Sequence, residues 1–312
     1  MSWNPLRSLT PRSALPAVAV LLVLTAGAAA HANRPVPFGD RVVAGSGASP
    51  VSAGASPVGA QSAGAVAPDL EVGPGLEAYD GTTGKLLWSY RREGATALHF
   101  AMVGENAVVV WDDGMVTSVR PSDHEVRWHR SVPGLSDWLS GDGDPVLAAK
   151  SDAERREATA KRAAAALQTA TETEPWVAVV TPSLTMGFRD RDGDLRYNSR
   201  PAAGCVYDPL RAVHTDNAVM VPRTCTGTTS AGSPIPGGIS GFWLSGHGWQ
   251  LNAGPEVLMR PLDKHRVAID DGPIVGTKTF DTLEGAQETT CGALAEPFAA
   301  APQGCQPRPD AG

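Results

Sequence analysis

The chain has 312 residues, of which 42% are hydrophobic, 19% charged and 6% aromatic, with 34 Gly, 26 Pro and a net charge of −7. This acidic balance excludes a typical nucleic-acid binder, which needs clustered cations to neutralise phosphates. The length allows one or two domains with a sizeable core, and the Gly and Pro content favours turns and linkers over long helices.

Residues 1–32 have the pattern of a targeting segment. Arg7 and Arg12 precede an uncharged run from Ala14 to Ala30, and small residues around His31 fit a cleavage site. The run is long for a signal peptide and short for a membrane-spanning helix. We therefore expect a single-pass protein of the cell membrane with an extracytoplasmic C-terminal domain, or, alternatively, a protein secreted after signal cleavage.

The composition divides the rest of the chain. Residues 33–74 are rich in Gly, Ala, Ser and Pro, which is typical of a flexible linker. Residues 75–285 carry short β-branched or aromatic runs separated by Asp, Gly and Pro turns, a pattern that predicts an all-β domain. Within it, residues 151–174 are Ala-rich and predict a partly exposed helical insertion capped by Ser151. Residues 286–312 lose the strand pattern and are expected to form an irregular tail.

A repeat carries the strongest signal in the sequence. Residues 76–88 and 116–128 are similar, and their final residues, Trp88 and Trp128, lie 40 positions apart. A weaker third copy ends at Tyr197, close to the same period once the helical insertion is left out. Each copy, together with the hairpin that follows it, supplies four strands, as one blade of a β-propeller requires.

The chemistry of the repeat explains its residues. Asp80 can accept hydrogen bonds from nearby N–H groups, next to Thr83, and Gly84 can adopt the positive φ that the turn needs. The aromatic residue that ends each copy is expected to pack between adjacent blades. The aromatic set is Trp88, Trp128 and Tyr197.

Residues 78–88, AYDGTTGKLLW, resemble the pyrroloquinoline-quinone-like (PQQ-like) β-propeller repeat, whose consensus is roughly A-x-D-x-x-T-G-K-x-x-W. The whole chain is similar to membrane-tethered, extracytoplasmic repeat proteins of high-GC Gram-positive bacteria. The match is specific over residues 75–135 and degenerate beyond. The resemblance implies a β-propeller-like fold of about four or five units in residues 75–285. Because rings of this family usually have about seven or eight blades, an incomplete ring is one interpretation.

The chain has four cysteines, and an even number in an extracytoplasmic protein indicates disulfides. Cys205 and Cys225 flank two short runs joined by a turn at residues 215–217, so we expect them to bridge a hairpin. The remaining pair is then Cys291 and Cys305. A zinc site is the alternative, but the sequence has no C-x-x-C pair.

Candidate catalytic and metal-binding patterns are weak. Asp190, Asp192 and Asp194 resemble a calcium loop, but Leu195 and Pro201 stand where an EF-hand needs Gly and Glu. We therefore interpret these residues as a repeat turn. The sequence has neither a HExxH nor a G-x-S-x-G motif, and it predicts no catalytic residue, no metal site and no identifiable cofactor-binding residue.

The resemblance also suggests a second interpretation, a quinone-dependent dehydrogenase. The alcohol-oxidising type usually shows adjacent cysteines and a set of calcium-binding carboxylates and amides, and neither is recognisable here. We therefore expect a non-enzymatic binding or scaffolding module at the cell envelope, without a cofactor. Its partner would be an envelope protein or a small ligand, with the membrane contacted through the N-terminal segment. The alternative is a PQQ- or metal-dependent oxidoreductase.

Overall fold

The structure is a computed structural model that describes residues 37–45, 68–228, 232, 235, 237–271 and 277–291. The described residues from Arg41 onward form one compact unit. Of residues 1–40, the described part is a short 3-10 turn, Pro37–Gly39, and Asp40. The predicted targeting segment 1–32 lies outside the described residues. Within these described ranges, no helix combines the length and the apolar character needed to cross a membrane.

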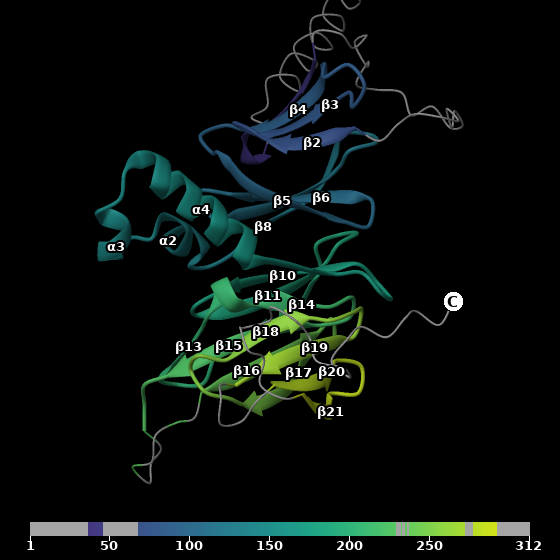
Figure 1. Cartoon of the computed structure of the whole chain (residues 1–312). Coiled ribbons are helices and arrows are strands. Elements are labelled where there is room, and N and C mark those ends of the chain that lie inside the picture. The colour runs from purple at the N-terminus through teal and green to yellow at the C-terminus, as the bar shows by residue number, and fades with distance from the viewer. Residues whose placement is uncertain are drawn as a thin grey trace, which may run out of the picture. The chain divides into compact units, whose positions relative to one another are not determined.

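Five antiparallel sheets follow one another along the chain (Figure 1). Sheet 1 has the order β1-β4-β3-β2, from strands β1 Asp40–Ala44, β2 Asp69–Val72, β3 Leu76–Tyr79 and β4 Leu86–Arg92. Sheet 2 comprises β5 Ala97–Val103, β6 Asn106–Trp111, β7 Met115–Arg120 and β8 Glu125–Ser131 in sequence order. Sheet 3 comprises β9 Leu167–Ala170, β10 Trp176–Thr181, β11 Leu184–Arg189 and β12 Leu195–Ser199, also in sequence order.

The last two sheets complete the series. Sheet 4 has five strands: β13 Cys205–Tyr207 and β14 Val213–His214 both pair with β15 Val219–Cys225, followed by β16 Gly238–Trp243 and β17 Gly246–Asn252. Sheet 5 comprises β18 Leu258–Pro261, β19 Arg266–Asp270, β20 Thr277–Asp281 and β21 Ala286–Cys291. The predicted all-β, propeller-like class is confirmed at this coarse level, and the described strands show no closed ring.

The sheets extend beyond the predicted repeat domain at both ends. Strands β1 and β2 fall in the segment 33–74 expected to be a linker, and β21 falls in the expected tail. The sequence of β2, Asp-Leu-Glu-Val, alternates polar and apolar residues as a strand does. The strand was not predicted because this four-residue pattern directly follows a Gly- and Ala-rich stretch.

The helical insertion is shorter and more divided than predicted. Helices α2 Leu135–Ser140 and α3 Pro145–Ala148 precede α4 Asp152–Ala166, and a 3-10 turn spans Pro209–Arg211 (Figure 1). Ser151 caps α4 through a capping box with Glu154, as the sequence indicates. The helix ends at Ala166 because residues 167–170 pair with β10 as strand β9, in place of the last part of the predicted helix.

Each aromatic repeat residue lies across from a small residue of the neighbouring strand. The register pairs are Ala78 with Trp88, Ser118 with Trp128, Gly187 with Tyr197 and Gly241 with Trp249. A Cβ added at Gly187 would collide with the Tyr197 ring, and one at Gly241 would collide with Trp249. Opposite Tyr197 and Trp249, glycine is therefore required because the ring occupies the position of a Cβ atom. Trp249 is a fourth copy that the sequence comparison missed.

Each ring also packs against the hairpin of the following sheet. The ring centroids of Trp88 and His124 lie 4.9 Å apart. Gly193, Gly246 and Gly285 lie against Trp128, Tyr197 and Trp249 in turn, so that a Cβ atom at each glycine would contact the aromatic residue. These four hairpin positions all have positive φ: 61° at His124, 65° at Gly193, 122° at Gly246 and 65° at Gly285. One repeated joint, an aromatic ring on a left-handed turn, thus connects each sheet to the next.

The first repeat turn has the expected geometry. The Asp80 carboxylate accepts hydrogen bonds from the N–H groups of Thr82 and Thr83 at 3.0 and 2.6 Å, and the hydroxyl of Thr83 donates to it at 2.9 Å. These bonds, led by the Thr83 N–H, lower the pKa of Asp80. Gly84 has φ 65° and donates its N–H to the Asp80 carbonyl at 2.7 Å. The Asp, Thr and Gly of this repeat copy therefore build the hairpin itself.

The two faces of sheet 1 differ sharply. Leu76, Trp88 and Tyr90 are buried against residues of sheet 2. On the opposite face, the Tyr79 hydroxyl donates to Glu77 at 2.8 Å, and Arg91 pairs with Glu77 at 3.1 Å. This face of sheet 1 is therefore polar, unlike the faces that join successive sheets.

The predicted Cys205–Cys225 disulfide is confirmed. The two residues are directly opposite in the register of β13 and β15, with Cα atoms 4.0 Å apart. The expected turn lies between them, since Thr215 donates its N–H to the Ala218 carbonyl at 2.9 Å. The second predicted pair stays a prediction, because Cys291 ends β21 and Cys305 lies outside the described residues.

Candidate functional site

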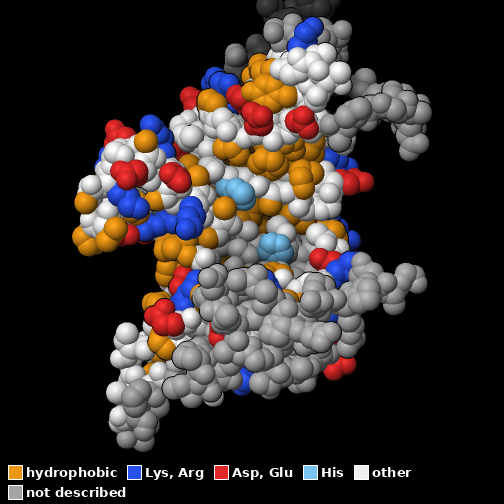
Figure 2. Space-filling view, in the orientation of Figure 1, with side chains coloured by type: hydrophobic (Ala, Val, Ile, Leu, Met, Phe, Trp, Pro, Cys, Tyr) orange, Lys and Arg blue, Asp and Glu red, His pale blue; other side chains and the backbone are white. Residues whose placement is uncertain are grey.

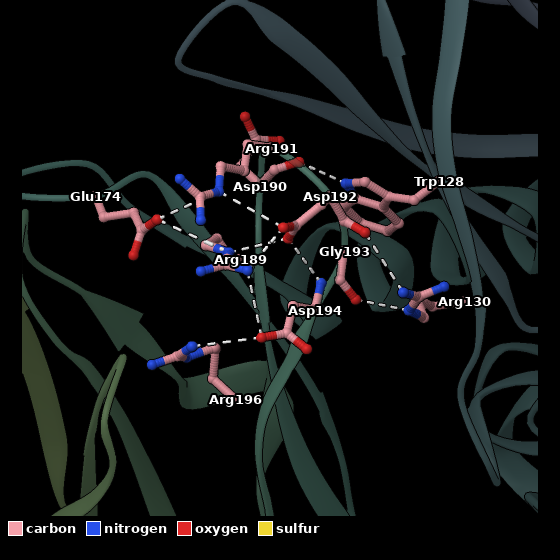
Figure 3. Close-up of polar contacts among 10 residues, drawn as sticks. All are labelled: Trp128, Arg130, Glu174, Arg189, Asp190, Arg191, Asp192, Gly193, Asp194 and Arg196. Carbon is pink, nitrogen blue, oxygen red and sulfur yellow. Dashed lines mark hydrogen bonds and ion pairs between the residues drawn. The ribbon is translucent and has the colours of Figure 1, made fainter.

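The three predicted aspartates are neighbours in sequence, in the hairpin between β11 and β12, but their side chains contact different partners (Figure 3). Asp190 is 4% exposed and accepts a 2.6 Å hydrogen bond from the Asn106 side chain. Asp192 and Asp194 instead pair with Arg189, at 2.7 and 3.4 Å. Among the residues that the structure describes, no three His, Cys, Asp or Glu side chains form a metal-binding group.

Asp190 forms a polar joint between sheets 2 and 3. The hydroxyl of Ser118 donates to its carboxyl group at 3.5 Å, and the indole N–H of Trp128 donates to its carbonyl oxygen at 2.5 Å. Burial raises the pKa of Asp190 to about 6, against the opposing effects of its hydrogen bonds with Asn106 and Ser118 and the charge of Arg120. The Oδ1 of Asn106 is buried without a hydrogen-bond partner, so the joint is only partly satisfied.

Asp192 has the opposite electrostatics. Its side chain accepts two hydrogen bonds from Arg189, at 2.9 and 2.7 Å. This ion pair holds the pKa of Asp192 at about 2. Arg130 of β8 donates to the Gly193 carbonyl at 2.6 Å, which fastens the same turn to sheet 2 (Figure 3).

We expect Asp190→Asn to change the pH dependence of stability. An acid whose pKa is raised on folding stabilises the fold fully below its unfolded value, near pH 4, and loses that contribution as pH rises through about 6. Relative to wild type, the variant should therefore gain on the order of 1–2 kcal/mol in unfolding free energy between pH 4 and pH 7. This is less than the pKa shift would give at about 1.4 kcal/mol per pKa unit, because solvent screens part of the charge. Urea unfolding at both pH values measures the difference.

Asp192→Asn is the matched control for this experiment. Its lowered pKa stabilises the fold above about pH 4, and this contribution is lost as pH falls toward 2. The two variants should therefore diverge from wild type in different pH windows. A wild-type profile that is parallel to the Asp190→Asn profile from pH 4 to pH 7 would contradict the assignment.

A cleft of about 480 Å³ lies beside this hairpin, where parts of sheets 3, 4 and 5 meet. Apolar side chains contribute much of its lining, namely Trp176, Trp243, Leu244 and Leu283. Three carboxylates and one guanidinium also line it, from Glu172, Glu174, Asp216 and Arg196. A volume of this size can hold a small molecule or one large side chain.

Backbone hydrogen bonds fix the loops that form the cleft. The Asp216 carbonyl accepts from the N–H groups of Thr171 and Glu172 at 2.8 and 2.9 Å, and the Asp216 N–H donates to the Lys264 carbonyl at 2.8 Å. The Trp243 indole donates to the Thr282 carbonyl at 2.9 Å. Loops of three different sheets therefore hold one another, and the cleft is preorganised.

The carboxylates of the cleft differ in how strongly they are paired. Glu172 contacts the His265 ring nitrogen at 2.6 Å, whereas Glu174 lies 3.8 Å from both Arg189 and Arg191. The Asp216 carboxylate has no hydrogen-bond or ion-pair partner among the residues described. Of the three carboxylates that line the cleft, that of Asp216 is therefore the least neutralised by neighbouring described residues.

A second surface lies along β5. Leu98 and Phe100 are half-buried and Met102 is 47% exposed, and Figure 2 shows hydrophobic and histidine side chains in the region where Figure 1 places this strand. Burial lowers the pKa of His99, which therefore favours the neutral form on this strand. The strand carries apolar contact area without a set of chemically reactive groups.

The predicted repeat residues and the cleft residues are different sets. Asp80, Thr83, Gly84, Trp88, Trp128 and Tyr197 lie in the repeat turns and joints, and Cys205 and Cys225 form the disulfide. None of these eight residues is among the lining of the cleft. The cleft was not predictable from the sequence, because its residues come from three separate sheets and share no local motif.

No protein-family model matches the chain, and no curated protein matches it. Among solved structures, the chain is similar to a europium-containing methanol dehydrogenase at 10% sequence identity and a TM-score of 0.40. The match covers 72% of this chain and 49% of that one, so the chain spans about half the length of that protein.

Proposed function

We propose that the protein is a non-enzymatic binding or scaffolding module of the PQQ-like β-propeller repeat type at the cell envelope. In this proposal residues 1–32 anchor it in the membrane, or are cleaved on secretion, and the sheets lie outside the cytoplasm. The observation that carries the proposal is the preorganised cleft between sheets 3, 4 and 5, which combines apolar walls with charged groups. Such a surface is suited to holding a ligand or a side chain of a partner.

A PQQ- or metal-dependent oxidoreductase is the alternative. Within the described part of the chain, no three acidic, histidine or cysteine side chains gather to hold a metal ion, so no specific observation there favours this alternative. The described disulfide joins cysteines 20 positions apart, unlike an adjacent pair. The buried Asp190 is engaged by Asn106 and Ser118 within a joint between sheets, which supports a structural role for it.

Spectroscopy and cell fractionation test the proposal together. We expect the purified full chain to show no quinone absorbance and no dye-linked dehydrogenase activity after addition of PQQ and Ca²⁺. In cells, we expect it in the membrane fraction or the medium, accessible to added protease. A bound quinone chromophore with alcohol-dependent dye reduction would favour the oxidoreductase instead, and a protease-protected cytoplasmic protein would overturn the proposed location.

A further inference from the structure

We infer that the cleft between sheets 3, 4 and 5 binds an organic cation, with an ammonium group held at Asp216 and Glu174 and an apolar body held against Trp243 and Leu283. This inference rests on the proposed binding role and names the ligand class for it. The charge, the wall composition and the rigidity of this one site support it.

The charge of the lining favours a cation. Three carboxylates line the cleft against one guanidinium, and Arg196 is already bound by Asp194 at 3.3 Å. Glu172 is occupied by His265 at 2.6 Å, and Glu174 lies 3.8 Å from the guanidinium groups of Arg189 and Arg191. The side-chain carboxylate of Asp216, unlike its backbone carbonyl, accepts no hydrogen bond from the described residues. The two weakly paired carboxylates are therefore the ones available to an incoming positive group.

The walls favour an organic cation over a bare metal ion. Trp243 and Leu283 provide aromatic and apolar surface, whereas Trp176 also lines the cleft but is only 2% exposed. Aromatic faces attract ammonium groups in addition to burying carbon. A metal ion would need several converging oxygen, nitrogen or sulfur ligands, and the described residues hold no such group of three. A primary amine with a carbon body of a few atoms satisfies both the carboxylates and the walls.

The rigidity of the cleft lowers the entropic cost of binding a ligand there. The main chain of Asp216 is held by three backbone hydrogen bonds from two neighbouring loops, and the Asn217 side-chain oxygen accepts from the hydroxyls of Thr215 and Thr282 at 2.9 and 2.6 Å. The carboxylate of Asp216 thus projects from a fixed backbone. A ligand would not have to order these loops on binding.

Isothermal titration calorimetry of the full-length protein tests the inference with benzylamine and its uncharged counterpart, benzyl alcohol. We expect saturable binding of benzylamine, at least about tenfold tighter than benzyl alcohol and weakened by salt. A parallel titration with a short lysine-containing peptide distinguishes a free amine from a protein side chain as the source of the cation. Equal binding of the amine and the alcohol, or no saturable amine binding, would overturn the inference.

Two neutralising variants locate the site. Asp216→Asn and Glu174→Gln should each weaken benzylamine binding by at least about fivefold. The matched control Glu93→Gln, at an exposed position in the turn after β4, should leave the binding unchanged. Unchanged thermal unfolding confirms that the variants are folded. Unaltered amine affinity in both cleft variants rejects this site, whereas the spectroscopic and fractionation results, which do not involve amines, decide the proposed function separately.

Discussion

Trp128→Ala is expected to lower the unfolding free energy by about 3–5 kcal/mol, the usual cost of removing a buried aromatic ring. Trp128 is 4% exposed, lies against the turn at Gly193 and donates its indole N–H to the Asp190 carbonyl at 2.5 Å. Its loss would open a cavity between sheets 2 and 3 and leave that carbonyl without its indole donor. Urea unfolding of the full chain at pH 7 measures the change.

Two further variants separate the contributions at this joint. Trp128→Phe keeps a ring but removes the hydrogen bond, and should cost less than the alanine variant. Leu195→Ala is the surface control, because Leu195 lies in the β11–β12 hairpin that contacts Trp128 but is itself 46% exposed. It should change stability by no more than about 0.5 kcal/mol. A loss below about 1 kcal/mol for Trp128→Ala would show that the ring does not hold the two sheets together.

Removal of the Cys205–Cys225 disulfide is expected to cost about 3 kcal/mol. The bridge closes a loop across a sequence separation of 20 residues, and the chain-entropy model gives roughly this stabilisation for a loop of such length. The double variant Cys205→Ala/Cys225→Ala should therefore unfold at a lower urea concentration than wild type. Strands β13 and β15 should lose protection from hydrogen exchange before the other sheets do.

Reduction of the wild type provides the comparison for this variant. Dithiothreitol should destabilise the wild type by at least as much as the double substitution, and it should have little further effect on the variant unless Cys291 and Cys305 are also bridged. Non-reducing peptide mapping of the double variant tests that second pair directly. Equal urea midpoints for oxidised wild type and the double variant would contradict the expected stabilisation.

Local patterns were sufficient to predict the parts of the fold that depend on neighbouring residues. The Cys205–Cys225 bridge was predictable because a turn at residues 215–217 lies between the two cysteines. Trp249 was harder to find, because its hairpin has a shorter turn: Trp249 follows Gly241 by eight positions, whereas Trp88 follows Ala78 by ten. The end of α4 was missed because Leu167–Ala170 becomes a strand only through pairing with β10.

The cleft could not be predicted from sequence for a different physical reason. Its carboxylates and indoles come from loops of three sheets, and no sequence spacing relates Glu174 to Asp216 or Trp243. Likewise, the sequence does not distinguish Asp190 from the other two aspartates of the same turn. Only the packing of sheet 2 against this turn buries it beside Asn106 and separates its pKa from that of Asp192.

The polar face of sheet 1 has a consequence for how such a chain can lengthen during evolution. A duplicated unit placed before sheet 1 would have to cover Glu77, Tyr79 and Arg91, and so would desolvate an ion pair without an apolar surface in return. A copy inserted between later sheets would meet the aromatic ring and left-handed turn that already join neighbours there. Internal duplication could thus add a sheet to this architecture without redesigning its first one.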